Sequence, residues 1–406
     1  MRLVVLGGSA SSTPELLDAM ATWPQAPVRR PNITLVLVGR DAKKLELVAR
    51  ACRLRSVGPG APVRVQTETD RRRALEDADV ILNQVRIGGL AARAFDESFP
   101  WEFGLPGEET MGPGGFANAL RTIPALSETW DDVSSIAPTA LVVNLTNPAG
   151  LVQQTATAGW PLRVVSVCDS PSTFLSTIAT RLERPLVAVQ RRYVGLNHLG
   201  WYIPESSDEF ARLLDLAAGI DPEQVRMLEA LPAPYVRYYV NPDRILERQR
   251  GAETRAGVLQ RLEAQLLAGF AEPTVGEVPR RGAVWYRLAV VPLIDAWIHG
   301  SDVPVFAGTR NDGRVSGLPD STVIEVPHVA PRPGVLVPLD PPQPHGIAAA
   351  LLQHHAIYEA LTAAAVLLGA TARDRLRALF ANPMVHSSDQ ARRLLERIEE
   401  GPPSMP

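Results

Sequence analysis

The 406-residue chain carries 41 Lys and Arg against 44 Asp and Glu, so its net charge is −3 and its pI is about 6.2. This balance argues against nucleic acid as a partner, and no apolar run reaches the roughly 18 residues of a membrane span. Two cysteines, Cys52 and Cys168, are too few for a disulfide framework. Because no secretory leader precedes the first apolar run, we expect a cytoplasmic protein, and its hydrophobic content of 46% suits two domains.

Short apolar runs alternate with helical patterns over the first 170 residues. The runs are rich in Val, Ile and Leu, as strands buried on both faces are. They occupy residues 2–6, 33–38, 63–66, 80–84, 140–145 and 163–167. Helical spacing over 14–22 and 43–54 separates the first three runs. The alternation predicts an α/β fold with a Rossmann-like, doubly wound parallel sheet, in which ligands bind beyond the carboxyl ends of the strands.

The alternation becomes irregular after about residue 170. Helical patterns appear at 171–181, 207–216, 253–270, 346–368 and 372–379. They predict a second, mixed α/β domain. The Pro-rich segment 331–344 is expected to form an extended loop. We place the dinucleotide-binding domain at 1–168 and a catalytic, substrate-binding and oligomerisation domain at 169–406.

A run of small residues directly follows the first predicted strand. Small residues at a strand-to-helix turn let backbone amides approach a pyrophosphate, whose charge the helix N-terminus favours. An ordinary tight turn is the alternative. The candidate cofactor-binding residues of this turn are Gly7, Gly8, Ser9, Ser11 and Thr13.

The second predicted strand ends in Gly39, Arg40 and Asp41. Dinucleotide folds place an acidic residue here to hold the ribose hydroxyls, whereas a nearby arginine accommodates a 2′-phosphate. Arg40 therefore indicates NADP, or at least a weakened preference for NAD. In the alternative interpretation Asp41 reaches the ribose and Arg40 points to solvent, so either NAD or NADP is expected.

Five further motifs lie at or just after the predicted strands, between them, or in the second half of the chain. They are Asn83-Gln-Val-Arg-Ile-Gly-Gly, Gly107-Glu-Glu-Thr, Asn144-Leu-Thr-Asn-Pro, Cys168-Asp169 and Gly195-Leu-Asn-His. With these motifs the chain resembles glycoside hydrolase family 4 over residues 1 to about 398. The resemblance implies a lactate/malate-dehydrogenase-like architecture, a nicotinamide cofactor and a divalent metal, Mn²⁺ in the first place.

The family resemblance also implies a redox-elimination route to glycoside cleavage. Sugar carbon 3 is oxidised by NAD(P), the aglycone is eliminated with help from the metal, water adds, and the sugar is re-reduced. This route differs from hydrolysis by two carboxylates. The implied partner is a small-molecule glycoside, with neither nucleic acid nor membrane involved, and a homo-oligomer (dimer or tetramer) is expected.

Catalytic roles follow from the same resemblance. Cys168 and His198 would bind the metal, although by residue type alone they would be a buried apolar cysteine and a satisfied core histidine. Tyr235, in Pro-Tyr-Val-Arg-Tyr-Tyr, would be the base that removes the carbon 2 proton. Tyr238 and Tyr239 are alternatives for that base.

The family resemblance also implies which further residues contact the cofactor and which contact the sugar. Asn83 and Glu109 would bind the cofactor. The sugar contacts fall to Arg86, Asn147, Asn197 and Arg281. The planar fork of arginine suits a 6-phosphate, or the carboxylate of a uronide.

Asp169 makes the anomer ambiguous, because α-acting members carry Asp there as the acid for the leaving group, while the rest of the chain is closer to the 6-phospho-β-glucosidase branch. The chain departs from the usual family residues at Ser9, Gly39, Glu108, Asp169 and Arg287, which indicates a divergent member. A nicotinamide-dependent dehydrogenase or epimerase of a sugar or hydroxy acid is the alternative function. A non-catalytic nucleotide sensor fits less well with a Cys–His pair and a tyrosine cluster.

Overall fold

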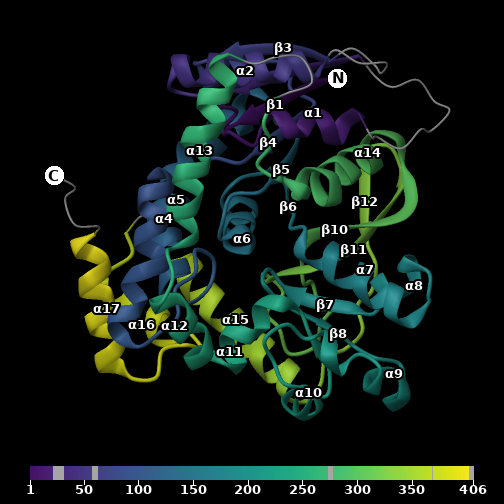
Figure 1. Ribbon diagram of the computed structural model, residues 1–406, viewed down its shortest axis with the longest axis vertical. Coiled ribbons are helices and arrows are strands. Elements are labelled where there is room, and N and C mark those ends of the chain that lie inside the picture. Colours follow the sequence, from purple (N-terminus) through teal and green to yellow (C-terminus); the bar gives the residue numbers. More distant parts are fainter. Residues whose placement is uncertain (22–31, 57–62, 273–277, 368, 402–406) are drawn as a thin grey trace.

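A computed structural model describes residues 1–21, 32–56, 63–272, 278–367 and 369–401. The first layer is a six-stranded parallel sheet with the order β3-β2-β1-β4-β5-β6, drawn at the top of Figure 1. Its strands are β1 Arg2–Leu6, β2 Ile33–Val38, β3 Val63–Glu68, β4 Val80–Asn83, β5 Leu141–Asn144 and β6 Arg163–Ser166. The strand order reverses between β1 and β4, so a crevice opens at the carboxyl ends of these strands. The predicted fold class is confirmed.

Helices cover both faces of this sheet, which is why Leu3, Val4 and Val5 of β1 have no exposed surface. Asp41 and Asp70 start two of the helices as N-caps that accept hydrogen bonds from backbone amides. The helices of this half are α1 Pro14–Ala21, α2 Ala42–Arg55, α3 Arg71–Leu75, α4 Gly89–Ser98, η1 Phe99–Phe103, α5 Gly112–Ile136 and α6 Ala149–Gly159. Helix α1 matches the predicted segment 14–22 as far as Ala21, and residue 22 lies outside the described residues.

The second half contains an antiparallel sheet with the order β10-β11-β7-β8-β9, in which β12 pairs with β11. Its strands are β7 Tyr193–Leu196, β8 Leu199–Tyr202, β9 Leu231–Pro232, β10 Ser301–Arg310, β11 Val323–Arg332 and β12 Val335–Pro338. The expectation of an extended loop over 331–344 is therefore wrong in its first part, which forms a hairpin. Its turn holds Gly334 at φ +77°, and Pro338 is tolerated because β12 pairs with β11 alone among the described strands.

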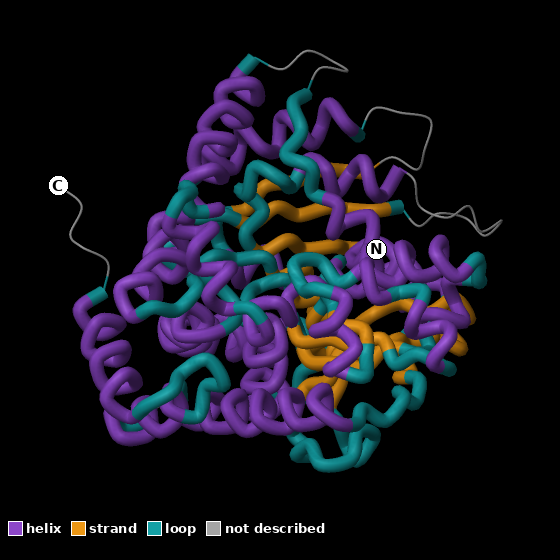
Figure 2. The backbone as a smooth tube through the Cα atoms, turned by 60° about the horizontal axis from the view of Figure 1, so that its bottom comes forward, coloured by secondary structure: helices purple, strands orange, loops and turns teal. Residues whose placement is uncertain are grey.

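Helices surround the second sheet and continue to the C-terminal end of the described chain (Figure 2). The predicted helix over 207–216 divides in two, and the one predicted over 346–368 ends at Ala365. The helices of this half are α7 Ser170–Leu182, α8 Leu186–Gln190, α9 Ser207–Ala211, η2 Leu214–Leu216, α10 Pro222–Leu228, η3 Pro234–Val236, α11 Arg237–Val240, α12 Pro242–Arg250, α13 Arg255–Ala271, the π-helical turn η4 Tyr286–Val290, α14 Val291–His299, α15 Gly346–Ala365, α16 Ala372–Phe380 and α17 Ser388–Glu400. Within the described residues, none of these helices has the length and apolarity needed to cross a membrane.

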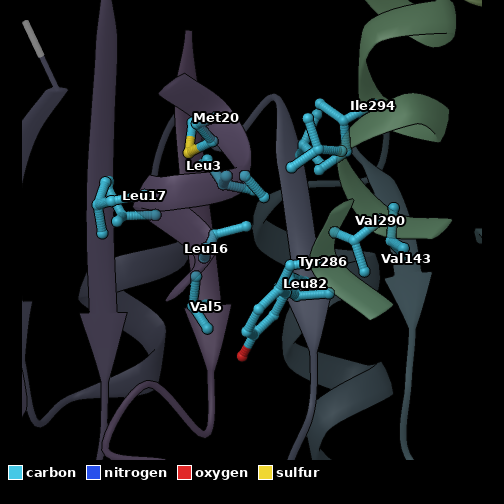
Figure 3. Close-up of a cluster of buried hydrophobic side chains, with 14 of the residues drawn as sticks. Leu3, Val5, Leu16, Leu17, Met20, Leu82, Val143, Tyr286, Val290 and Ile294 are labelled. Atoms are coloured by element: carbon cyan, nitrogen blue, oxygen red, sulfur yellow. The ribbon is translucent and has the colours of Figure 1, made fainter. Parts of the chain in front are cut away.

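The two halves share one hydrophobic core. Tyr286, Val290 and Ile294 pack against the first sheet beside Leu3 and Leu82, as Figure 3 shows. Elements η4 and α14 therefore hold the second half against the first sheet. The division of the chain at 168/169 stays a prediction.

A polar contact joins the edge of the first sheet to the second. Gln153 Oε1 accepts hydrogen bonds from the backbone amide and the hydroxyl of Ser166, both at 2.7 Å, while Gln153 Nε2 donates to the carbonyl of Gly308 at 2.9 Å. A Cβ atom at Gly308 would lie 2.2 Å from the Gln153 side chain. The joint therefore requires glycine, and it fixes β10 beside β6, next to the residues that follow β6.

Candidate active site

The turn after β1 has the geometry of a dinucleotide-binding loop. Gly7 adopts φ +81°, and a Cβ atom at Gly8 would lie 2.8 Å from Leu37 Cα, so side chains are excluded at both positions. Thr13 Oγ1 accepts a hydrogen bond from Gln84 Nε2 at 3.1 Å, which ties the turn to the end of β4. Ser9, Ser11 and Thr13 line the same turn, immediately before α1. The turn can hold a pyrophosphate against the N-terminus of α1.

The polar ends of β4 and β5 form the floor of the crevice. Asn83 and Asn144 lie opposite each other in the strand register, and Asn83 Nδ2 donates to Asn144 Oδ1 at 2.8 Å. Asn83 is fully buried, and its Oδ1 atom has no hydrogen-bond partner. A ligand donor at the strand ends would satisfy this oxygen. The assignment of Asn83 to the cofactor stays a prediction.

Glu109 lies among arginines rather than at the dinucleotide turn. Its carboxylate forms ion pairs with Arg86 and with Arg93, the latter at 2.9 Å, and accepts from Asn147 Nδ2 at 3.3 Å. Burial alone would raise the pKa of Glu109, but Arg86 and Arg93 lower it to about 2. The structure thus brings Glu109, predicted for the cofactor, together with Arg86 and Asn147, predicted for the sugar. These roles stay predictions.

Arg281 is a largely buried cation without a carboxylate partner among the described residues. Its guanidinium lies over the Trp285 ring, 4.9 Å from the ring centroid. Burial lowers the pKa of Arg281, and the neighbouring charges of Arg86 and Arg93 lower it further. An anion bound beside these arginines would relieve their repulsion, so this group of arginines is a candidate anion site.

The carboxylate of Glu15, on α1, holds the backbone of the loop that carries Arg281. It accepts hydrogen bonds from the amides of Arg281, Gly282 and Ala283 at 2.5, 3.0 and 2.6 Å. Glu15 is buried, so these three bonds are shielded from water. The loop is therefore fixed by the first helix of the chain.

Cys168 and His198 meet in the crevice from two different elements. Cys168 follows β6, and His198 occupies the two-residue turn between β7 and β8 with φ +64°. Burial raises the pKa of the Cys168 thiol, and a hydrogen bond with His198 opposes that rise. The imidazole Nδ1 of His198 is buried without a hydrogen-bond partner, 3.8 Å from the Glu108 carboxylate.

A soft thiol beside an unsatisfied imidazole nitrogen suits a divalent transition metal. Among the described residues, no group of three or more His, Cys, Asp and Glu side chains could hold a metal. A two-residue site would leave the other coordination positions open to substrate and water, as a catalytic metal requires. The residues present therefore fit the predicted metal.

Tyr235 is the tyrosine that faces this pair. Its ring stacks on the His198 imidazole at 3.8 Å between centroids and 5° between planes. His198 lowers the pKa of Tyr235, but burial and the nearby acidic groups raise it more, so the pKa lies above its usual value. Tyr238 packs behind Tyr235 at 6.3 Å, and Tyr239 bonds to His355 at 3.1 Å. Of the three candidates for the base, the geometry favours Tyr235.

The turn that carries His198 is fixed by a carboxylate that the sequence motifs did not indicate. Glu325, on β11, is buried and accepts hydrogen bonds from Asn197 Nδ2 at 3.3 Å and from the Tyr193 hydroxyl at 3.1 Å. Burial raises the pKa of Glu325 to about 7. The other polar atom of Asn197, Oδ1, is buried without a partner. Asn197 therefore keeps a free acceptor beside the predicted metal ligand.

Asp169 follows Cys168 and lies at the N-terminus of α7. Burial raises its pKa, as a group that donates a proton requires. Sequence reasoning missed Glu15, Arg93, Trp285 and Glu325. Nothing local in the sequence pointed to the contacts of Glu15, Arg93 and Glu325, because their partners come from other elements of the fold.

The fold and the crevice define a class: dinucleotide-binding α/β proteins with lactate/malate dehydrogenase architecture. A malate dehydrogenase from Naegleria fowleri shares the fold, with a TM-score of 0.54 at 14% identity over 90% of this chain and 98% of that one. The family models define a narrower group than the fold does. Residues 2–184 match the model for family 4 glycosyl hydrolases, and residues 193–385 match the model for the C-terminal domain of that family. The chain belongs to family 4 of the glycosyl hydrolases, which confirms the resemblance seen in the sequence.

Individual relatives cover nearly the whole chain. A probable 6-phospho-beta-glucosidase of Bacillus subtilis (strain 168) is 30% identical over 98% of this chain and 96% of its own length. The 6-phospho-beta glucosidase of Thermotoga maritima, solved with NAD and glucose-6-phosphate, superposes with a TM-score of 0.87 at 28% identity over 99% of this chain and 98% of that one. The same enzyme was also solved with manganese, NAD+ and glucose-6-phosphate. A phospho-alpha-glucosidase, PagL of Clostridium acetobutylicum, is 25% identical over 98% of this chain and 97% of its own length.

Proposed function

We propose that the protein hydrolyses 6-phospho-β-glucosides, using a nicotinamide dinucleotide and Mn²⁺. The observation that carries the proposal is the arrangement of the crevice. The dinucleotide turn lies at one side and the Cys168–His198–Tyr235 cluster at another, and Arg281, which has no carboxylate partner among the described residues, feels the charges of Arg86 and Arg93. The relatives support the β anomer, because the β-acting ones named above are 28–30% identical and the α-acting one is 25% identical.

The chemistry divides between the bound groups and the side chains. A bound nicotinamide would accept and return a hydride, while a divalent cation held by Cys168 and His198 would act as a Lewis acid. The chain itself has to bind and orient the sugar and move protons. Asn147 and Asn197 offer amide groups for sugar hydroxyls, and Asn197 Oδ1 lacks any other partner.

Tyr235 and Asp169 are proposed to move the two protons of the reaction. The Tyr235 hydroxyl would remove the proton from sugar carbon 2, and positive charge at the neighbouring Cys168–His198 pair would lower its pKa toward the working range. Asp169, whose pKa burial raises, would give its proton to the leaving oxygen. The stack of Tyr235 on His198 fixes the base beside the metal ligands.

Arg281 is proposed to bind the 6-phosphate. A phosphate carries two negative charges near neutral pH and accepts the paired N–H donors of a guanidinium. Arg86 and Arg93 are balanced by Glu109 and Glu97, the latter 2.6 Å from Arg93, whereas Arg281 has no carboxylate partner in the described chain. The excess of one positive charge therefore lies at Arg281.

Nitrophenyl glucosides test the proposal directly. We expect release of nitrophenol from the 6-phospho-β-glucoside in the presence of Mn²⁺ and catalytic NAD(P), and little from the unphosphorylated or α-linked compounds. If only the α-linked 6-phosphoglucoside were cleaved, the substrate would be the α anomer and not the β anomer. Stoichiometric reduction of cofactor without nitrophenol would instead identify a dehydrogenase and refute the proposal.

A homodimer through α15 is proposed as the assembled form. Apolar or small residues recur at intervals of three and four on its outer face, and Ile347 and Ile357 are 43% and 51% exposed. The stripe comprises Ile347, Ala350, His354, Ile357, Leu361 and Ala364. Two copies of such a stripe can pack antiparallel about a two-fold axis. We place the protein in the cytoplasm, where its thiol ligand stays reduced.

Light scattering of the purified protein tests the dimer. We expect twice the chain mass of 44.0 kDa for the wild type and a monomer for Ile357→Asp. Val303→Asp is the matched control, because Val303 is 67% exposed on β10, away from α15. A dimer that persists in Ile357→Asp would place the interface elsewhere.

A further inference from the structure

The end of β2 lacks the acidic group that holds the ribose hydroxyls of NAD in dinucleotide folds. Gly39 occupies the first position after the strand, and its amide donates to the carbonyl of Glu68 at 3.3 Å. A Cβ atom at Gly39 would lie 3.1 Å from both Cβ and Oγ of Ser9. Gly39 therefore packs directly against Ser9, which brings the end of β2 up to the dinucleotide turn.

The two acidic side chains nearest to this point are already engaged. Asp41 caps α2, and its Oδ1 atom accepts from the amides of Lys43 and Lys44 at 3.0 and 3.1 Å. The Glu68 carboxylate, at the end of β3, accepts from the amides of Thr69 and Asp70 at 2.8 and 3.0 Å. Each carboxylate is therefore tied through one oxygen to the backbone amides that follow it, and the position directly after β2 carries no acidic side chain.

Arg40, directly after Gly39, carries a charged side chain without a partner among the described residues. It is exposed, and no hydrogen bond or ion pair joins it to any other described residue. The Ser9 hydroxyl likewise makes no hydrogen bond within the described chain. A free guanidinium at the end of β2 and a free hydroxyl on the adjoining dinucleotide turn can together bind an anion on the adenine ribose.

We propose that Arg40 and Ser9 bind the 2′-phosphate of NADP(H), so that the protein selects NADP(H) over NAD(H). The inference rests on the proposed function, which supplies the dinucleotide site. The guanidinium of Arg40 would neutralise the phosphate and donate two hydrogen bonds to it, and the hydroxyl of Ser9 would donate another. NADH would leave the same guanidinium without an acceptor.

Fluorescence titration of NADPH and NADH tests the selection by binding alone. We expect NADPH to bind at least ten-fold more tightly than NADH, a difference of about 1.4 kcal/mol. Arg40→Asp should reverse the order, because the new carboxylate repels the 2′-phosphate and accepts from ribose hydroxyls. The competitors 2′,5′-ADP and 5′-AMP differ by the 2′-phosphate alone. We expect 2′,5′-ADP to compete better than 5′-AMP for the wild type but not for Arg40→Asp.

Arg64→Asp is the matched control, because Arg64 is also exposed and unpaired within the described residues but lies at the start of β3. It should bind both nucleotides as the wild type does. Equal affinities, or tighter binding of NADH, would overturn the inference and leave the glycosidase proposal intact. Binding of neither nucleotide would overturn both.

Discussion

Glu109 offers a prediction whose magnitude follows from the structure. Its pKa is about 2 in the folded protein against 4.5 for the free side chain, a shift of about 2.5 units. At 1.36 kcal/mol per unit the ionised carboxylate contributes about 3 kcal/mol to the free energy of unfolding at neutral pH. Glu109→Gln should lose about this amount, because the amide leaves Arg86 and Arg93 without their shared countercharge.

Urea denaturation at several pH values measures this loss. Because the folded pKa is depressed, the contribution of Glu109 is present above pH 4.5 and disappears as the pH falls toward 2. The difference between the wild type and Glu109→Gln should therefore be full at pH 7, still large at pH 4.5 and largely gone at pH 2.

A matched control for Glu109→Gln is Glu102→Gln, which removes an exposed carboxylate paired with Arg397 at 3.4 Å. Exposed ion pairs contribute about 1 kcal/mol or less, so the control should change stability little. If Glu109→Gln lost no more than this control at pH 7, the assignment of Glu109 as the buried countercharge of two arginines would be wrong.

The other predictions concern activity. Cys168→Ser should be inactive, and added Mn²⁺ should not restore its activity. Full activity of this variant in the presence of a chelator would rule out the metal assignment. Tyr235→Phe should lower the rate by about 10²–10⁴ and prevent deuterium incorporation at sugar carbon 2 in D₂O; wild-type product without that label would count against elimination. Arg281→Met should raise KM for the 6-phospho-β-glucoside by about 10- to 100-fold, as expected for a lost hydrogen bond to a charged group, and an unchanged KM would place the phosphate elsewhere.

The sequence predicted the first sheet well because its signal is local. Strands buried on both faces read as continuous apolar runs, and all six lie within two residues of their predicted ends. The hairpin at 323–338 was missed because prolines suggest a loop, while the pairing of β11 with β12 depends on a neighbouring strand.

The site was predictable where a motif identified a side chain, and it was not where the partner comes from a distant element. Cys168, His198 and Tyr235 do lie together. By contrast, Glu325 reaches Asn197 across 128 positions of sequence, and nothing near Glu325 indicates that contact. The grouping of Glu109 with Arg86 and Arg93 likewise depends on how α4 packs against the following loop.

The hydrogen bonds from the amides of residues 281 to 283 to Glu15 limit how this chain can be recombined with its relatives. The contact joins positions 266 residues apart, so any chimera with a single crossover between them takes the carboxylate from one parent and the loop from the other. A graft of the first sheet alone would release the Arg281 loop even if every strand folded, because the acceptor of its amides would be foreign. A chimera that keeps this contact therefore has to take helix α1 and the Arg281 loop from the same parent.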